Sequence, residues 1–238
     1  LARVVWSSLW QDITAPAAVS ALALSLITGL IATGVCLIRG IPLALVNADA
    51  ALLLSNKTLS PIAQRVLFGF PADFGNAAGK AVVTGNPVRQ AILDLPLPAE
   101  RFAGRSGPLR VLVVGGSLGA KVLNDSVPAA LAQIDANVRP VVTHQSGKKN
   151  IDALRAAYGE AGVAAQCVPF IEDMAGCYAE ADIVLCRGGA ITVAELAAAG
   201  VASIIVPLPG AIADEQSANA KLLVDAGVAA LDACAGIC

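Results

Sequence analysis

The chain has 238 residues, enough for one large domain or two ordinary domains that each bury a core. Its 16 Lys and Arg and 18 Asp and Glu give a net charge of −2, so it lacks the basic excess that gathers nucleic acid, and we expect no nucleic-acid partner. Hydrophobic residues make up 56% and charged residues 14%, which suits parallel sheets whose strands are covered on both faces and read as apolar runs.

The six cysteines include no CxxC pair and have no His at metal-ligand spacing. The sequence therefore indicates neither a metal site nor a disulfide framework.

Residues 13–38 carry no charge, and an apolar run of this length is a candidate membrane span. Pro16, Gly29 and Gly34 interrupt the run, so a buried helix followed by a buried strand is the other interpretation. The chain begins at Leu1 in mid-pattern and stops at Cys238 just after an expected strand, so we expect a fragment of a longer protein.

After Pro42, the stretch LALVNADAALLLSN predicts a strand, a loop and a short helix, and residues 81–84 predict a short strand. Gly85-Asn86-Pro87-Val88-Arg89 then interrupts regular structure and marks a crossing between domains. We expect one domain over residues 1–86 and a second over 87–238. The Pro-, Ala- and Arg-rich segment up to Pro108 is predicted to be a loosely packed linker.

From Leu109 onward, strands and helices alternate regularly. The expected strands are 109–114, 140–143, 166–169, 182–186, 202–206 and 228–231, and the expected helices are 120–134, 150–161, 173–179, 191–199 and 216–226. Alternation at these lengths implies βαβ units, and hence a parallel sheet with right-handed crossovers. Ligands of such sheets bind beyond the carboxyl ends of the strands.

The stretch VVGGSLGA (113–120) runs from a strand through glycines into a helix. Glycines let a backbone approach an anion, and the free amides and positive dipole end of a helix stabilise negative charge, so this turn is a candidate phosphate cradle. Tight strand-to-helix turns also use glycine for purely geometric reasons. The spacing departs from GxGxxG and no acidic residue ends the next strand, which disfavours a nicotinamide dehydrogenase.

A second turn of this kind, Cys186-Arg187-Gly188-Gly189-Ala190, is followed by Glu195. Two such helix starts facing one crevice could compensate the charge of a diphosphate, and Glu195 could accept hydrogen bonds from two ribose hydroxyls. The alternative for Glu195 is an acid near the helix start that complements the helix dipole.

His144, the only histidine, invites a catalytic role. We expect instead a structural hydrogen-bonding role, since nothing in the sequence brings it close to a reacting group. Cys167, Cys177 and Cys186 lie in or beside apolar elements, where a free cysteine behaves as a small hydrophobic residue.

Six motifs together resemble the MurG family in order and spacing. They are GNPVR (85–89), VVGGSLGA (113–120), HQSG (144–147), FIEDM (170–174), CRGGAITVAE (186–195) and DEQSANA (214–220). The resemblance covers almost all of residues 42–230 and implies an α/β fold of the GT-B type. In that fold a Rossmann-like parallel-sheet donor domain (87–238) follows a partial second Rossmann-like domain (1–86) on the acceptor and membrane side.

The resemblance also implies the substrate-binding residues. Ser117 and the amides around it, including Gly116 and Gly119, would hold the diphosphate, and Gly189 and Ala190 would offer amides to a phosphate. Arg89 would sit at the hinge near the donor, Ile171 would meet the uracil and Met174 of the same motif would also bind substrate. Glu195 would bind the ribose hydroxyls and Gln216 hydroxyls of the sugar.

Several family features have no counterpart in this chain. The first GGTGGH loop, which supplies the acceptor-side His, is absent, so the catalytic residue is unknown, and the family's C-terminal helix is missing as well. Gly188 stands where Ser or Ala is usual, and Gly210 stands where a polar residue such as His is common.

The implied activity is metal-independent, inverting transfer of N-acetylglucosamine from UDP-GlcNAc to undecaprenyl-pyrophosphoryl-MurNAc-pentapeptide, with no cofactor. The family works on the cytoplasmic face of the bacterial inner membrane as a peripheral protein, so the membrane surface is an expected partner. We expect impaired turnover from the chain as given. The alternatives are a non-catalytic UDP-sugar-binding remnant and a membrane-spanning protein built on residues 13–38.

Overall fold

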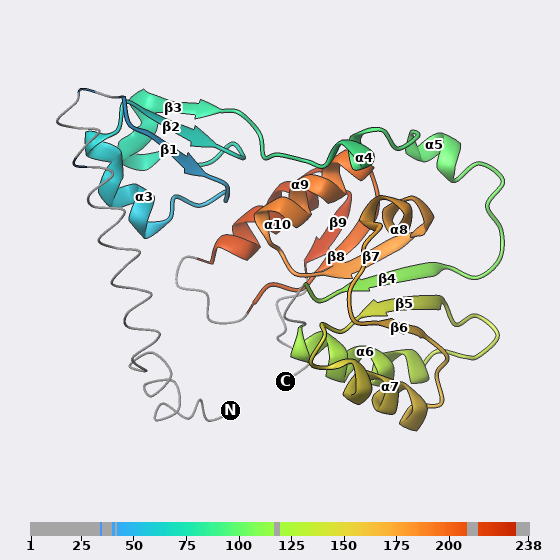
Figure 1. Cartoon of the computed structure of the whole chain (residues 1–238). Helices are drawn as coiled ribbons and strands as arrows, with labels where there is room; N and C mark the ends of the chain where they lie inside the picture. Colours follow the sequence, from blue (N-terminus) through green and yellow to red (C-terminus); the bar gives the residue numbers. More distant parts are fainter. Residues whose placement is uncertain (1–33, 35–39, 41, 117–119, 209–213, 232–238) are drawn as a thin grey trace, which may run out of the picture.

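The computed structural model describes residues 34, 40, 42–116, 120–208 and 214–231. Its strands form two separate sheets, one of three strands and one of six, which lie side by side (Figure 1). All strand pairs in both sheets are parallel. The predicted α/β architecture with two parallel-sheet units is therefore confirmed.

The first sheet has the order β1-β2-β3, formed by β1 (Ala44–Asn47), β2 (Arg65–Phe68) and β3 (Ala81–Val83). Its connections contain α3 (Leu54–Leu59) and two 3-10 helices, η1 (Ser60–Ile62) and η2 (Gly75–Lys80). Val66 and Phe68 of β2 are fully buried at the centre of its small core. The sequence predicted β1, α3 and β3, but we did not predict β2.

The second sheet has the order β6-β5-β4-β7-β8-β9. Its strands are β4 (Arg110–Val114), β5 (Val141–Gln145), β6 (Gln166–Val168), β7 (Ile183–Cys186), β8 (Ala202–Ile205) and β9 (Ala229–Leu231). From β4 the chain moves outward to β5 and β6, then returns to the other side of β4 and moves outward again through β8 and β9. The order therefore reverses between β4 and β7, and parallel sheets bind ligands at this kind of switch point.

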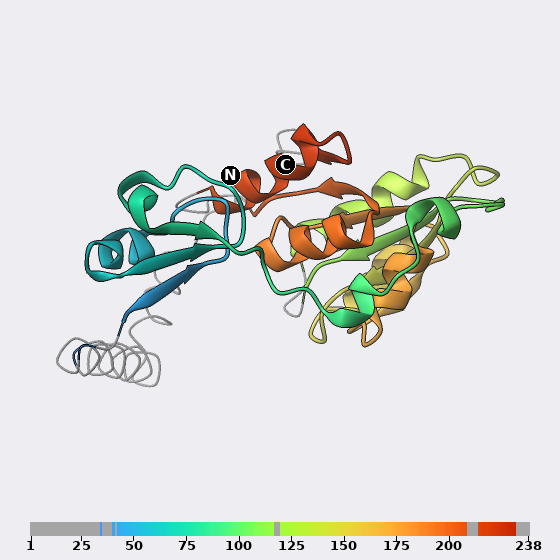
Figure 2. The ribbon, with the colours of Figure 1, turned by 90° about the horizontal axis from the view of Figure 1, so that it is seen from above.

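The helices of this part cover both faces of the second sheet (Figures 1 and 2). They are α6 (Lys121–Ala132), α7 (Ile151–Glu160), α8 (Met174–Glu180), α9 (Ala190–Ala199) and α10 (Glu215–Asp225). One buried cluster joins α6 and α7 to one face of β4 and β5, and a second joins α8, α9 and α10 to the other face of the sheet. Every expected strand and helix after Leu109 is present, with ends that differ by one or two residues.

Most residues of the segment between the two sheets are exposed, as expected for a linker, but the segment is anchored to the second sheet at a few points, so the prediction of loose packing holds only in part. It contains α4 (Gln90–Leu93) and α5 (Pro98–Arg101), and Ile92 is buried in the core cluster with α8 and α9. The Arg105 guanidinium donates to the carbonyls of Ala179 and Glu180 and pairs with Asp182 at 2.7 Å. Arginine and proline suggested a solvated linker, but here the arginines satisfy carbonyl groups at the end of α8.

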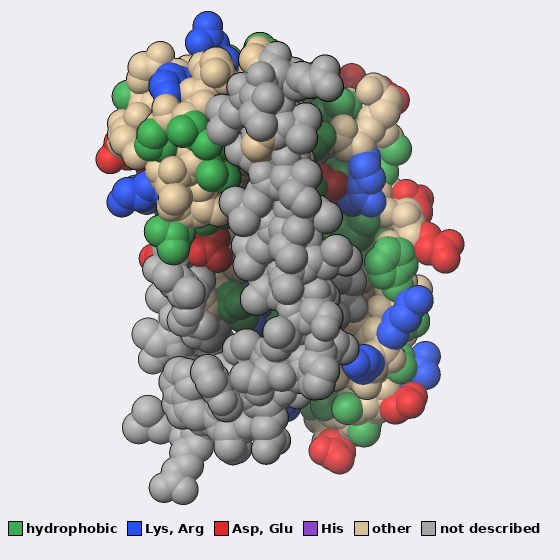
Figure 3. Space-filling model, turned by 60° about the vertical axis from the view of Figure 1, so that its left-hand side comes forward, with side chains coloured by type: hydrophobic (Ala, Val, Ile, Leu, Met, Phe, Trp, Pro, Cys, Tyr) green, Lys and Arg blue, Asp and Glu red, His purple; other side chains and the backbone are tan. Residues whose placement is uncertain are grey.

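Among the described residues, we find no helix long and apolar enough to cross a membrane. The candidate span over residues 13–38 falls almost entirely outside the described part of the chain. On the face seen in Figure 3, Lys and Arg side chains are interspersed with Asp and Glu side chains.

Candidate functional site

The two glycine turns end neighbouring strands at the switch point of the second sheet. Val114, the last residue of β4, lies opposite Cys186, the last residue of β7. The turns that begin at Gly115 and Arg187 therefore leave the same edge of the sheet side by side. Gly116 has a φ of +77°, a backbone conformation that favours glycine. Ser117 and Gly119 lie outside the described residues, so their predicted contacts to a diphosphate stay predictions.

Gly188 packs closely against α10 in this chain. A β-carbon at this position would lie 2.4 Å from the main-chain carbonyl oxygen of Gln216, so the Ser or Ala that is usual in the family would need a slightly wider separation between the turn and the helix. This contact supports the geometric explanation for one glycine of the turn. Gly189 caps α9 without a side-chain hydrogen bond, and Ala190 is the first residue of the helix. The amides of this first turn have no partners within the helix, as an anion site requires.

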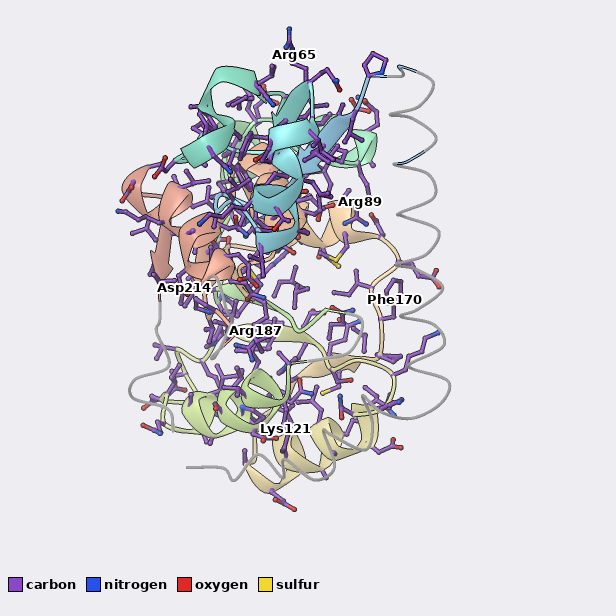
Figure 4. The ribbon with its side chains drawn as sticks, turned by 90° about the vertical axis from the view of Figure 1, so that its left-hand side faces the viewer. Arg65, Arg89, Lys121, Phe170, Arg187 and Asp214 are labelled. Carbon is purple, nitrogen blue, oxygen red and sulfur yellow. The ribbon has the colours of Figure 1, made fainter. Side chains whose placement is uncertain are left out.

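Arg187 links the second glycine turn to the segment that follows β8. Its guanidinium donates to the carbonyls of Val206 (3.0 Å) and Pro207 (2.7 Å), just beyond the end of β8. Figure 4 shows Arg187 at mid-height in the molecule, between the first sheet and α6, which carries Lys121. The arginine thus ties the turn after β7 to the end of β8.

Glu195 lies in the second turn of α9, where its side chain is buried and only 5% of the residue is exposed. The Arg89 Nε donates to Glu195 Oε1 at 2.8 Å, and the Arg89 Nη2 donates to Glu195 Oε2 at 3.0 Å. The two residues therefore form a bidentate ion pair. The dipole alternative for Glu195 is wrong, because the helix dipole acts on the first turn and α9 has no acid there. The structure therefore brings together Arg89 and Glu195, two of the residues that we predicted for the site.

Tyr178 of α8 adds a third contact to this carboxylate. Its hydroxyl donates to Glu195 Oε2 at 3.4 Å, and its ring is almost completely buried. Burial, and then the charge of Glu195, raise the pKa of the Tyr178 hydroxyl, so the residue stays protonated and keeps donating. Sequence reasoning did not single out Tyr178, because its role depends on a contact between two helices.

Ile171 and Met174 have side chains buried in the larger core cluster. Ile171 follows β6 at the carboxyl edge of the sheet, and within the described part of the chain no residue hydrogen-bonds to its main-chain N–H or C=O. The main-chain groups of Ile171 could therefore hydrogen-bond to a planar base, and its side chain lies beneath them. The contact to uracil stays a prediction, as does the substrate role of Met174.

Gln216 lies in the first turn of α10 and is half-buried. Its Oε1 accepts a hydrogen bond from the Leu208 N–H at 3.0 Å, so its amide nitrogen is the group left to meet a ligand. Its predicted contact to sugar hydroxyls stays a prediction. Gly210 lies outside the described residues.

His144 is fully buried and has a partner at each ring nitrogen. Its Nδ1 lies 2.9 Å from the Tyr158 hydroxyl and its Nε2 lies 3.1 Å from Asn124 Oδ1. Burial lowers the pKa of the imidazole to about 4. These contacts support the predicted structural role.

Asn219 is a site residue that sequence reasoning missed. It is fully buried on α10, and its Nδ2 donates both to Gly188 O (3.0 Å) and to Asp49 Oδ1 (2.8 Å). Its Oδ1 accepts from the Ala50 N–H at 2.6 Å. Asn219 therefore joins the loop after β1 to the glycine turn after β7, and the carboxyl edges of the two sheets meet at this residue.

A cavity of about 530 Å³ lies away from this junction, beneath α8. It is lined near the amino ends of β4 and β5 by residues that include Ser106, Arg110 and Val141. Ligands of parallel sheets bind at the opposite, carboxyl edge, so we assign the site to the junction. No group of three or more His, Cys, Asp or Glu among the described residues could hold a metal ion.

These features define a protein of the GT-B type: two Rossmann-like parallel sheets meet at their carboxyl edges over a pair of glycine turns. Comparisons with known proteins identify the family. Residues 110–233 match the glycosyltransferase family 28 C-terminal domain, which is more than half of the chain.

The curated relatives are named UDP-N-acetylglucosamine–N-acetylmuramyl-(pentapeptide) pyrophosphoryl-undecaprenol N-acetylglucosamine transferase. The one from Janthinobacterium sp. (strain Marseille) is 69% identical over 183 residues, which cover 77% of this chain and 51% of that protein. The chain thus spans about half the length of the curated relatives it matches.

Two solved structures are similar to the chain. The crystal structure of Acinetobacter baumannii MurG is 39% identical, with a TM-score of 0.69 over 83% of this chain and 55% of that chain. A glycotransferase of kitacinnamycin, with a TM-score of 0.57 and 16% identity, shares the fold. The chain belongs to glycosyltransferase family 28, and its resemblance to the MurG family is confirmed.

Proposed function

We propose that the chain is the donor-binding part of an inverting N-acetylglucosaminyltransferase. It moves N-acetylglucosamine from UDP-GlcNAc to undecaprenyl-pyrophosphoryl-MurNAc-pentapeptide, a step of peptidoglycan synthesis. The observation that carries the proposal is the strand register that pairs Val114 with Cys186. This register brings the two glycine turns, each leading into the amino end of a helix, to one edge of the sheet. The names of the relatives support the choice of donor and acceptor.

In this proposal, the amides at the two turns compensate the charge of the diphosphate, and no metal takes part. Glu195 accepts hydrogen bonds from the ribose hydroxyls. Since Arg89 occupies both of its carboxylate oxygens, the ribose either shares these oxygens or displaces the arginine. Arg89 is about half exposed and can be rehydrated when it leaves, but the Glu195 carboxylate is buried, so the ribose hydroxyls must replace the hydrogen bonds that the arginine makes.

The acceptor is linked to a lipid, so we propose that the protein works peripherally at the cytoplasmic face of the inner membrane. Apolar and basic surface would hold it there.

Calorimetry tests donor binding and its geometry. We expect UDP-GlcNAc to bind more tightly than UDP-glucose, and EDTA to have no effect. Glu195→Gln keeps the shape of the side chain and removes its charge, and should weaken UDP binding about tenfold or more, as charge-assisted hydrogen bonds of about 1.5–3 kcal/mol would. Glu160→Gln, on the exposed end of α7, should bind like the unaltered chain.

The ribose contact can be isolated with 2′-deoxy-UDP. The unaltered chain should lose affinity when the hydroxyl is removed, and Glu195→Gln should lose much less, because the two changes remove the same contact. Additive losses would place the ribose elsewhere. If neither UDP-GlcNAc nor UDP binds, the proposal is wrong.

A further inference from the structure

One arginine occupies the carboxylate that we propose binds the ribose. The Arg89 Nε and Nη2 donate to the two oxygens of Glu195 at 2.8 and 3.0 Å. The Glu195 side chain is 7% exposed, whereas the Arg89 side chain is 53% exposed. Without a ligand, the ribose site is therefore filled by a side chain that keeps about half of its surface in water.

The backbone that carries Arg89 is anchored to the second sheet, so the side chain can move without the chain. Arg89 is the N-cap of α4, and its carbonyl accepts from the main-chain N–H of Ile92 at 2.9 Å. Ile92 is 1% exposed and packs in the core cluster that includes Val193 and Leu196 of α9. Release of the guanidinium from Glu195 would leave these contacts intact.

Tyr178 keeps the carboxylate partnered when the arginine leaves. Its hydroxyl donates to Glu195 Oε2 at 3.4 Å, and the residue is 1% exposed in the same core cluster. A buried carboxylate without partners is costly, but Tyr178 and two ribose hydroxyls together can replace the arginine. The site can thus exchange its cation for a ribose without leaving the charge of Glu195 unsatisfied.

The phosphates of a bound nucleotide would lie close to the released guanidinium. Glu195 is five residues along α9 from Ala190, about 7.5 Å at the rise of an α-helix, and helical side chains lean back toward the amino end. A ribose at Glu195 therefore brings the attached diphosphate near the arginine. A guanidinium pairs with two phosphate oxygens in the same way as with two carboxylate oxygens.

We propose that Arg89 fills the ribose site in the free protein and moves from Glu195 to the diphosphate when a nucleotide binds. The inference rests on the proposed function. It makes Arg89 a specificity-determining residue, because a bare nucleoside displaces the arginine into water, whereas a nucleoside diphosphate gives it a new anionic partner. Arg89 therefore weakens the binding of uridine and strengthens the binding of UDP.

The test compares UDP with uridine in the same variants. Arg89→Met keeps an unbranched side chain and removes the charge and every donor. We expect the Kd for UDP to rise about tenfold or more, the scale of charge-assisted hydrogen bonds. The Kd for uridine should fall about threefold or more, since the arginine no longer competes for Glu195. Calorimetry measures UDP, and an NMR titration measures the weaker uridine.

Two further variants support the comparison. Arg89→Lys keeps the charge but not the two-point geometry, so both constants should move in the same directions by smaller factors, and it serves if Arg89→Met does not fold. Arg155→Met is the matched control, because Arg155 lies on α7 with a side chain 60% exposed and pairs with Asp152 at 3.7 Å. It removes the same charge from the chain and should leave both constants unchanged.

The sign of the uridine change decides the outcome. Weaker binding of both ligands would overturn the inference, because a merely structural role for Arg89 weakens every ligand of the site. Weaker UDP binding with unchanged uridine binding would also overturn it, since the arginine would then bind phosphate without filling the ribose site. Unchanged constants for both ligands would do the same. If UDP does not bind to the unaltered chain, the proposed function itself is wrong.

Discussion

At the scale of single residues, His144 shows how one hydrogen-bond chain fixes a protonation state. The Asn124 Nδ2 donates to the Ser146 carbonyl at 3.2 Å, so the Asn124 Oδ1 is the atom that faces the imidazole. The proton therefore resides on Nε2, and Nδ1 accepts from the Tyr158 hydroxyl. The folded chain holds the imidazole neutral, with both nitrogens satisfied.

This arrangement predicts a pH dependence of stability with a definite sign. The folded pKa of His144, about 4, lies below its ordinary value of 6.5, so the unfolded chain binds more protons between these values. The contribution of the neutral imidazole is complete above about pH 6.5 and is lost as the pH falls toward 4, by as much as about 3 kcal/mol. Since this is the only histidine, an NMR titration of its ring reports the pKa directly. A midpoint near 6.5 would contradict the buried, neutral state.

Sequence reasoning found the residues that carry a local signal and missed those that act through distant partners. Glu195 follows a glycine turn and could be recognised, whereas its pairing with Arg89 joins residues 106 positions apart. Asp49 stands in an Ala- and Leu-rich stretch without any motif, and its contact with Asn219 spans 170 positions. No periodicity or spacing within the sequence could have shown either contact.

At the scale of elements, the strands of the second sheet were predictable because short segments rich in apolar residues alternate regularly with helical segments. β2 was not, because Gln64 and Arg65 lead into only three apolar residues, Val66, Leu67 and Phe68, before Gly69. Its pairing with both β1 and β3 makes it the central strand of the first sheet. Partners far along the chain determine this strand more than its own sequence.

The segment between the sheets is held by Arg105, whose replacement should be costly. In Arg105→Ala the Asp182 carboxylate, 15% exposed, loses its ion-pair partner, and the Ala179 and Glu180 carbonyls lose a donor. We expect a loss of about 2–4 kcal/mol in the free energy of unfolding, measured by urea denaturation.

Arg110→Ala is the control for this measurement. Arg110 approaches Glu180 only to 4.0 Å, and both side chains are largely exposed, so the loss should stay within about 1 kcal/mol. Its backbone N–H still donates to Asp182 Oδ2. Equal losses in the two variants would show that the Arg105 contacts do not stabilise the segment.

The Arg105 contacts also predict how Asp182 titrates. Burial opposes its ionisation, but the Arg110 N–H and the Arg105 guanidinium outweigh burial and lower its pKa. The stability from this pair is therefore present above the ordinary carboxyl range and is lost as the pH falls through the lowered pKa. Arg105→Ala should weaken this acid dependence.

At the scale of the whole molecule, two parallel sheets meet at their carboxyl edges, and a small set of buried polar groups joins them. The Asn86 Nδ2 donates to the Ala48 carbonyl at 2.9 Å, and Asn219 joins Asp49 and Ala50 to Gly188. Because buried polar groups without partners are costly, these bonds hold the loop of one sheet against the turn of the other. The parts of the molecule that we propose contact donor and acceptor are thus fixed relative to each other.

The central claim is that the diphosphate of a UDP-sugar lies between the two glycine turns at the switch point. A crystal soaked with UDP-GlcNAc tests it most directly. We expect density for the diphosphate between Gly116 and the Gly189–Ala190 amides, with the ribose at Glu195. A nucleotide bound in the cavity lined by Ser106 and Arg110 would contradict the claim. A nucleotide that leaves the Arg89–Glu195 ion pair unchanged and places no phosphate at the turns would contradict it as well.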